Sequence, residues 1–118
     1  MPDGVKKKTL ANPLIWGEGT WRLLHCTAAT FPKIPTEKDY RAYTRFLHSM
    51  APILPCRFCR EHMAKFLKEN PIRPILEKGR RSFMLWTIRF HNSVNKKLGK
   101  PILPAAEAVR SIRTLCTK

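Results

Sequence analysis

The sequence predicts an all-α fold, a four-helix bundle with a short fifth helix near the C-terminus. Apolar residues recur at spacings of three and four along most of the 118 residues, as they do on the buried face of a helix. No segment shows the alternation and turn residues of a β-hairpin. Prolines and glycines separate the helical stretches by short connections, which is typical of a bundle in a single domain.

The first two helices are predicted from their N-terminal caps. Residues 1–12 are basic and lack periodicity, so we expect a flexible arm followed by one domain over residues 13–118. Asn12 as N-cap and Pro13 at the first helical position start a helix that runs to about residue 30. Thr36 and Asp39 have the spacing of a capping box and start a second helix that ends near residue 51.

The remaining helices are predicted from proline and glycine positions. A third helix is expected from residue 55 or 56 to Asn70, followed by a basic connection over residues 71–81. Ser82 is the expected N-cap of a fourth helix that ends at Gly99. Pro104 is expected to open a short last helix that continues to about residue 115.

Charge, apolar content and cysteine count indicate which kinds of partner and which cellular compartment to expect. The formal net charge of +15 suits acidic partners such as phosphates, nucleic acid or an anionic cofactor. No run of 18 apolar residues exists, so no membrane span is expected. The N-terminus lacks the apolar stretch of a secretory signal, which predicts a cytoplasmic location. Four cysteines are too few for a disulfide scaffold.

Cys56 and Cys59 form a C-x-x-C pair at the predicted start of the third helix. A helix N-terminus stabilises a thiolate, so we expect a lowered thiol pKa and a redox-active pair. The alternative is a zinc site in which His62 is a third ligand. Its fourth ligand would be Cys26, Cys116 or another histidine, at no recognisable spacing.

Two other helices carry polar rings and amides beside apolar residues. Trp21 and His25 are four residues apart and share one helix face. On the fourth helix His91 and Asn95 lie on a stripe with Val94 and Leu98. A planar heterocycle fits such a surface, because an aromatic ring stacks on it and an amide hydrogen-bonds to its edge. Lysines at 96, 97 and 100 could contact a pyrophosphate.

Three motifs in this order resemble the Erv/ALR family of sulfhydryl oxidases. They are W-G-x-x-x-W-x-x-x-H over residues 16–25, P-C-x-x-C over 55–59 and H-N-x-V-N-x-x-L-G-K over 91–100. The resemblance implies FAD held inside the bundle and a homodimer. It also implies an enzyme that forms disulfides in a client dithiol protein, such as a thioredoxin-like one, and reduces oxygen to hydrogen peroxide.

The resemblance also implies residue roles. Cys59 would face the flavin and Cys56 would exchange with substrate, while Trp86 and His91 would bracket the adenine. The implied cofactor contacts are Trp16, Gly17, Trp21, His25, His62, Phe66, Trp86, His91, Asn92, Val94, Asn95, Lys97, Leu98 and Lys100. No metal site is expected, and nucleic acid is not expected as a partner.

The chain departs from the family at its remaining cysteines. Family members commonly carry a further structural disulfide, but Ile88 and Ala105 occupy those places, so packing alone is expected to hold the last helix. Cys26 is expected to be a buried free thiol. Cys116 is left open as a free surface thiol, a shuttle or an inter-subunit bridge. A module this small resembles the versions encoded by large cytoplasmic DNA viruses.

Two functions from other classes remain as alternatives. A small nucleic-acid-binding module with a structural zinc would explain the basic charge and the C-x-x-C pair, but not the Trp/His pairing or the H-N-x-V-N segment. A thioredoxin-like thiol carrier without flavin would need strands, and none are predicted.

Overall fold

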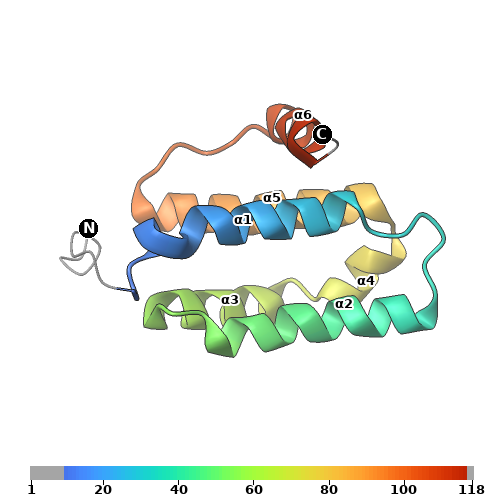
Figure 1. Ribbon diagram of the computed structural model, residues 1–118, viewed down its shortest axis with the longest axis horizontal. Coiled ribbons are helices and arrows are strands. Elements are labelled where there is room, and N and C mark those ends of the chain that lie inside the picture. Colours follow the sequence, from blue (N-terminus) through green and yellow to red (C-terminus); the bar gives the residue numbers. More distant parts are fainter. Residues whose placement is uncertain (1–9, 117–118) are drawn as a thin grey trace.

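The computed structural model describes residues 10–116, and within that range it contains helices and no strands (Figure 1). The all-α prediction of four bundle helices and a further C-terminal helix is confirmed. The helices are α1 (Pro13–Ala29), α2 (Glu37–Met50), a 3₁₀ turn η2 (Ala51–Ile53), α3 (Arg57–Glu69), α4 (Ile72–Glu77), α5 (Arg80–Leu98) and α6 (Ala105–Cys116). Most of the predicted arm, residues 1–9, lies outside the described residues.

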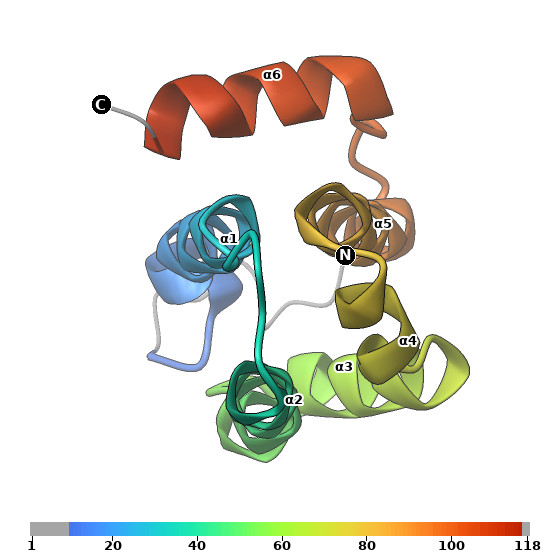
Figure 2. The same cartoon turned by 90° about the vertical axis from the view of Figure 1, so that its right-hand side faces the viewer.

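The helices form three layers. Viewed end-on, α1 and α5 lie side by side in the middle, with α2, α3 and α4 on one side and α6 on the other (Figure 2). None of the helices in the described range is both long and apolar enough to cross a bilayer.

The predicted caps at the first two helices are present. The Asn12 side chain accepts a hydrogen bond from the backbone N–H of Leu14 at 3.0 Å. Thr36 Oγ1 accepts from the Asp39 N–H, and the Asp39 carboxylate accepts from the Thr36 N–H at 2.8 Å. Gly99 ends α5 with φ +71°, a conformation that glycine adopts without strain.

Two predictions about residues 71–82 were wrong. The segment contains α4, because Ile72 and Leu76, four residues apart, are both buried in the core. Pro74 is compatible with this helix because it lies in the first turn, where a proline removes no helical hydrogen bond. Helix α5 begins at Arg80 with Gly79 as N-cap, so Ser82 lies inside the helix.

An aromatic core closes the bundle at the end where α1 leads into α2. Phe31 and Phe83 are both fully buried. Phe31 packs edge-on against Phe83, with ring centroids 5.8 Å apart, and against Tyr43 at 4.9 Å. We call this group of three rings the aromatic core. Edge-to-face contacts of this kind are favourable beyond the apolar area that they bury.

A disulfide joins Cys26 of α1 to Cys116 at the end of α6, with the two Cα atoms 5.4 Å apart. This corrects three predictions: Cys26 is not a free thiol, Cys116 is neither free nor a shuttle or inter-subunit bridge, and α6 is not held by packing alone. Val109 and Ile112 of α6 are also buried. The two cysteines are 90 residues apart in sequence, so only the path of α6 across α1 brings them together.

Candidate functional site

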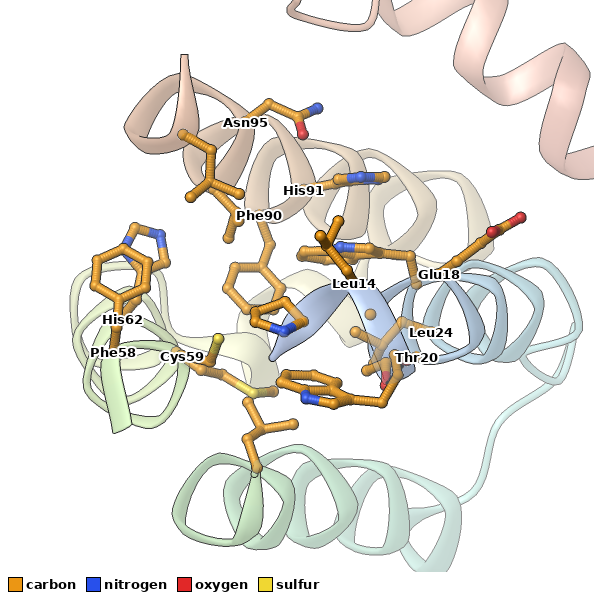
Figure 3. Close-up of a pocket in the computed structure, with 18 of the residues that line it drawn as sticks. Leu14, Glu18, Thr20, Leu24, Phe58, Cys59, His62, Phe90, His91 and Asn95 are labelled. Atoms are coloured by element: carbon orange, nitrogen blue, oxygen red, sulfur yellow. Dashed lines mark hydrogen bonds between the residues drawn. The ribbon is translucent and has the colours of Figure 1, made fainter. Parts of the chain in front are cut away.

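A cavity of about 400 Å³ lies between α1, α3 and α5 (Figure 3). Apolar and aromatic side chains form most of its wall, including Leu14, Leu24, Met63 and Phe90. The residues that the sequence motifs singled out supply much of the rest. A mostly apolar concavity of this size with a few polar groups is typical of a small-molecule or cofactor site.

The dithiol lies at the α3 side of this cavity. Cys59 lines the cavity, whereas Cys56, the N-cap of α3, is not among the lining residues. Both are half-buried free thiols. Cys56 Sγ accepts a hydrogen bond from the Cys59 N–H at 3.3 Å, so the pair is held at the helix start, as the sequence predicted. One sulfur therefore faces the cavity and the other does not.

The expected lowering of a thiol pKa does not hold for Cys59. Burial, and after it a side-chain hydrogen bond with Cys56, raises the pKa of Cys59 to about 12. The backbone amide and the positive charge of Arg60 lower the Cys59 pKa, but burial outweighs them. In the reduced pair Cys59 is therefore a protonated thiol at neutral pH.

Stacked rings from α1 and α5 form another part of the wall. Trp21 and His91 are nearly parallel, at 7°, with centroids 4.0 Å apart. His25 lies behind His91, with its Nε2 3.0 Å from His91 Nδ1 and its Nδ1 3.0 Å from Thr87 Oγ1. Thr87 was not predicted as a site residue. Its position one turn before His91, as a polar residue on an apolar stripe, could have indicated a partner for a buried histidine.

His25 and His91 are uncharged at neutral pH, because the pKa of each ring is lowered. Burial, and after it electrostatic repulsion from the neighbouring His91 ring, lowers the pKa of His25 to about 4. Burial and the nearby Lys100 lower the His91 pKa to about 4. Burial also lowers the pKa of His62, whose Nε2 is 2.9 Å from Ser93 Oγ.

Asn95 contributes a side-chain amide to the cavity wall, and this amide has no hydrogen-bond partner within residues 10–116. Its side chain lines the cavity and the residue is only 7% exposed. No hydrogen bond joins its side-chain amide to the rest of residues 10–116. The amide is therefore free to bind a ligand whose edge both donates and accepts hydrogen bonds. Trp21 and His91 offer that ligand a flat surface, as a flavin ring requires.

The structure brings most of the predicted cofactor contacts to one cavity, and their contact with FAD stays a prediction. Besides Cys59 and His91, the predicted residues that line it are Trp16, Gly17, Trp21, His62, Val94, Asn95, Leu98 and Lys100. Those that do not are His25, Phe66, Trp86, Asn92 and Lys97.

Packing explains why several of these residues lie elsewhere. Trp86 is fully buried and its indole N–H donates to the Asn70 carbonyl at 3.0 Å, so it lies in the core and not on the cavity wall. Phe66 packs against Trp86. Asn92 hydrogen-bonds both the N–H and the C=O of Leu103, which holds the segment that leads into α6. Lys97 is exposed.

Two aromatic residues of the cavity wall, Phe90 and Phe58, were not predicted as site residues. Phe90 belongs to the apolar stripe of α5, and Phe58 lies between the two cysteines with 44% of its surface exposed. The zinc alternative loses two possible ligands, because Cys26 and Cys116 are bonded to each other. Residues 10–116 contain no cluster of three or more side chains suited to hold a metal ion.

Comparisons with known proteins agree with this geometry. Residues 18–113 match the model of the Erv1 / Alr family. The chain is 38% identical over 103 residues to the FAD-linked sulfhydryl oxidase ERV1 of Oryza sativa subsp. japonica, covering 85% of this chain and 52% of the rice protein. It is 35% identical over 106 residues to the probable FAD-linked sulfhydryl oxidase R368 of Acanthamoeba polyphaga mimivirus, covering 90% and 74% of the two chains.

The fold matches a solved structure of the same kind. The crystal structure of the yeast Erv1 core superposes with a TM-score of 0.76 and 33% identity, covering 82% of this chain and 80% of that one. This chain spans about half the length of the rice relative. The family match covers most of the helical bundle, including the C-x-x-C pair and the H-N-x-V-N segment. The chain therefore belongs to the Erv1 / Alr family.

Proposed function

We propose that this chain is an FAD-linked thiol oxidase, with residues 13–118 as its FAD-binding domain. It would oxidise dithiols of client proteins to disulfides and reduce oxygen to hydrogen peroxide. The observation that carries this proposal is the position of Cys59, one half of a C-x-x-C pair, on the wall of a cavity shaped by Trp21, His91 and Asn95. The names of the rice and mimivirus relatives support it.

The residues that would hold FAD divide by chemistry. Trp21 and His91 offer a flat stacked surface, and the Asn95 amide offers hydrogen bonds to a ring edge. Lys100 supplies positive charge at the wall. When bound, FAD would supply two-electron chemistry between the dithiol and oxygen. The protein's own contribution is to place the dithiol beside that cofactor and to limit the access of water.

The different positions of the two sulfurs suggest different roles. In the oxidised pair, a client thiolate attacks Cys56, the sulfur that does not face the cavity, and the Cys56–Cys59 bond breaks as a mixed disulfide forms. A second client thiolate then attacks the client sulfur of that mixed disulfide, which releases oxidised client and leaves both enzyme cysteines reduced. The released Cys59 thiolate takes up a proton because its pKa is raised. It must lose that proton again before the pair can be reoxidised.

We further propose the client, location and assembly of this enzyme. The client would be a protein dithiol, such as that of a thioredoxin-like protein, in the cytoplasm of the cell or of an infected host. The net charge of +15 favours an acidic client. The enzyme would act as a homodimer, and the exposed apolar residues Leu23 of α1 and Phe46 of α2 favour a contact through those helices.

An absorption spectrum tests the proposed function directly. The purified protein, with FAD added, should show a flavin spectrum that bleaches under a dithiol and recovers in air, with hydrogen peroxide formed. Cys56→Ser protein is the matched control and should bind FAD without bleaching. A protein that takes up no flavin, or binds it but stays oxidised under dithiol, would overturn the proposal.

A further inference from the structure

We propose that Thr87 fixes the tautomers of His25 and His91, so that the cavity presents His91 Nε2 as a hydrogen-bond acceptor and selects a ligand that donates a hydrogen bond there. Thr87 is a positioning residue in this arrangement, because it acts through the two imidazoles. The inference rests on the proposed function only in naming FAD as that ligand.

Thr87, His25 and His91 form a chain of hydrogen bonds, and the Thr87 hydroxyl determines which atom donates in each bond. Thr87 Oγ1 lies 2.7 Å from the Met84 carbonyl oxygen, the usual length of an O–H···O hydrogen bond. Two oxygens this close need a proton between them, so the single hydroxyl proton points at Met84. The hydroxyl can then only accept from His25 Nδ1, 3.0 Å away. His25 therefore carries its proton on Nδ1.

The tautomer of His25 determines the tautomer of His91. His25 and Thr87 are both buried, which disfavours a charged imidazole and leaves His25 with one ring proton. His25 Nε2 is then a bare acceptor, and it lies 3.0 Å from His91 Nδ1. His91 must place its proton on Nδ1 to complete that bond. The lowered pKa of both rings agrees with two neutral imidazoles.

The far nitrogen of His91 is the one that remains for a ligand. His91 lines the cavity and its ring is held flat against Trp21. Its Nδ1 is taken up by His25, and Nε2 has no hydrogen-bond partner within residues 10–116. A neutral imidazole protonated on Nδ1 offers only a lone pair at Nε2. FAD carries groups that can donate to it, in its imide N–H, its amino group and its hydroxyls.

Histidine NMR of the wild-type protein tests the tautomers without any variant or ligand. Long-range ¹H–¹⁵N spectra of protein labelled at histidine, at neutral pH and without FAD, should show His25 and His91 both protonated on Nδ1 and bare on Nε2. A proton on Nε2 of either ring would overturn the proposal. Because no ligand is needed, this result stands even if the protein binds no FAD, which would refute only the proposed function.

Two Thr87 variants separate the hydroxyl from the shape of the side chain. In Thr87→Val, His25 Nδ1 loses its acceptor. A buried N–H without a partner is the rarer and costlier outcome, so both rings should switch to Nε2–H. His91 would then repel the ligand donor, and FAD affinity should fall about tenfold, as for one lost hydrogen bond. Thr87→Ser keeps the hydroxyl and should keep wild-type tautomers and affinity.

The tautomer readout distinguishes positioning from a purely structural role. If Thr87→Val folds and binds FAD tenfold less tightly with unchanged tautomers, the loss comes from packing and the proposal fails. It also fails if Thr87→Ser switches the rings. If Thr87→Val does not fold, the wild-type spectra and the Thr87→Ser spectra still decide the matter.

Discussion

The two ends of the α1–α5 pair use the same kinds of side chain for opposite purposes. In the aromatic core, Phe31 and Phe83 meet edge-to-face and are fully buried. At the other end, Trp21 and His91 stack face-to-face and form the wall of a cavity. Edge-on rings interlock from several directions, whereas parallel rings leave one flat face for another group. Aromatic residues thus stabilise the fold at one end and prepare a binding surface at the other.

The largest effect is expected from the thiol at the cavity. Cys59→Ser should reduce dithiol oxidation at least about a thousandfold, because the pair can no longer cycle. FAD absorbance and the melting temperature should stay near wild type. Oxygen uptake and flavin absorbance measured on the same sample check both parts. Turnover above a tenth of the wild-type rate would contradict the role given to Cys59.

Truncating one ring at each end tests the contrast itself. Phe83→Ala in the aromatic core should lower the free energy of unfolding by about 4 kcal/mol, through lost burial and a new cavity. Trp21 is only half-buried, so Trp21→Ala should lower the free energy of unfolding of the FAD-free protein by only about 1–2 kcal/mol.

Ligand binding should show the reverse order. Trp21→Ala should weaken FAD binding by more than tenfold, whereas folded Phe83→Ala protein should keep its affinity within about threefold. Urea unfolding without FAD and spectral titration with FAD measure the two effects. Equal stability losses for both variants would remove the distinction between the two ends.

Removing the Cys26–Cys116 disulfide should lower stability by less than Phe83→Ala and should leave the cavity unchanged. A Cys26→Ser/Cys116→Ser protein should lose about 3 kcal/mol of stability, because the bond closes a long loop in the unfolded chain. FAD affinity should change less than twofold, since neither cysteine lines the cavity. Urea unfolding and flavin titration measure both effects. Thiol titration that finds four free cysteines in unreduced wild-type protein would refute this bond.

Acid should destabilise the cavity end through His25. Its pKa is about 4 in the fold, below the ordinary 6.5, so the unfolded chain binds the proton more readily. The stabilisation from the neutral ring is complete above about pH 6.5 and is lost as the pH falls towards 4, by about 2–3 kcal/mol. His91 should contribute less, because it is more exposed.

Unfolding curves between pH 4 and 7 measure this dependence. His25→Gln should flatten the curve in that window, although it also lowers stability at pH 7. A variant that keeps the full wild-type slope would show that His25 is not responsible for it.

Local chemistry made much of this protein predictable. Caps such as Asn12 and the Thr36–Asp39 pair act within one helical turn, so the helix starts that they predict are present. The C-x-x-C pair and the H-N-x-V-N segment each lie within a single helix start or face. The structure brings Cys59 of the first motif and His91, Val94 and Asn95 of the second to one cavity. Helix α4 was missed because it is only six residues long, and the burial of Ile72 and Leu76 that holds it depends on tertiary packing.

The sequence alone determined the helical class, most helix ends and which residues carry the chemistry, because these depend on neighbours within a few positions. Only the tertiary structure decided which side chains reach the cavity. It buried Trp86 in the core, paired Cys26 with Cys116 across 90 residues, and raised the pKa of Cys59. It also joined Thr87 to His25 across α5 and α1. Each of these depends on how helices distant in sequence pack together, and packing sets both contact and desolvation.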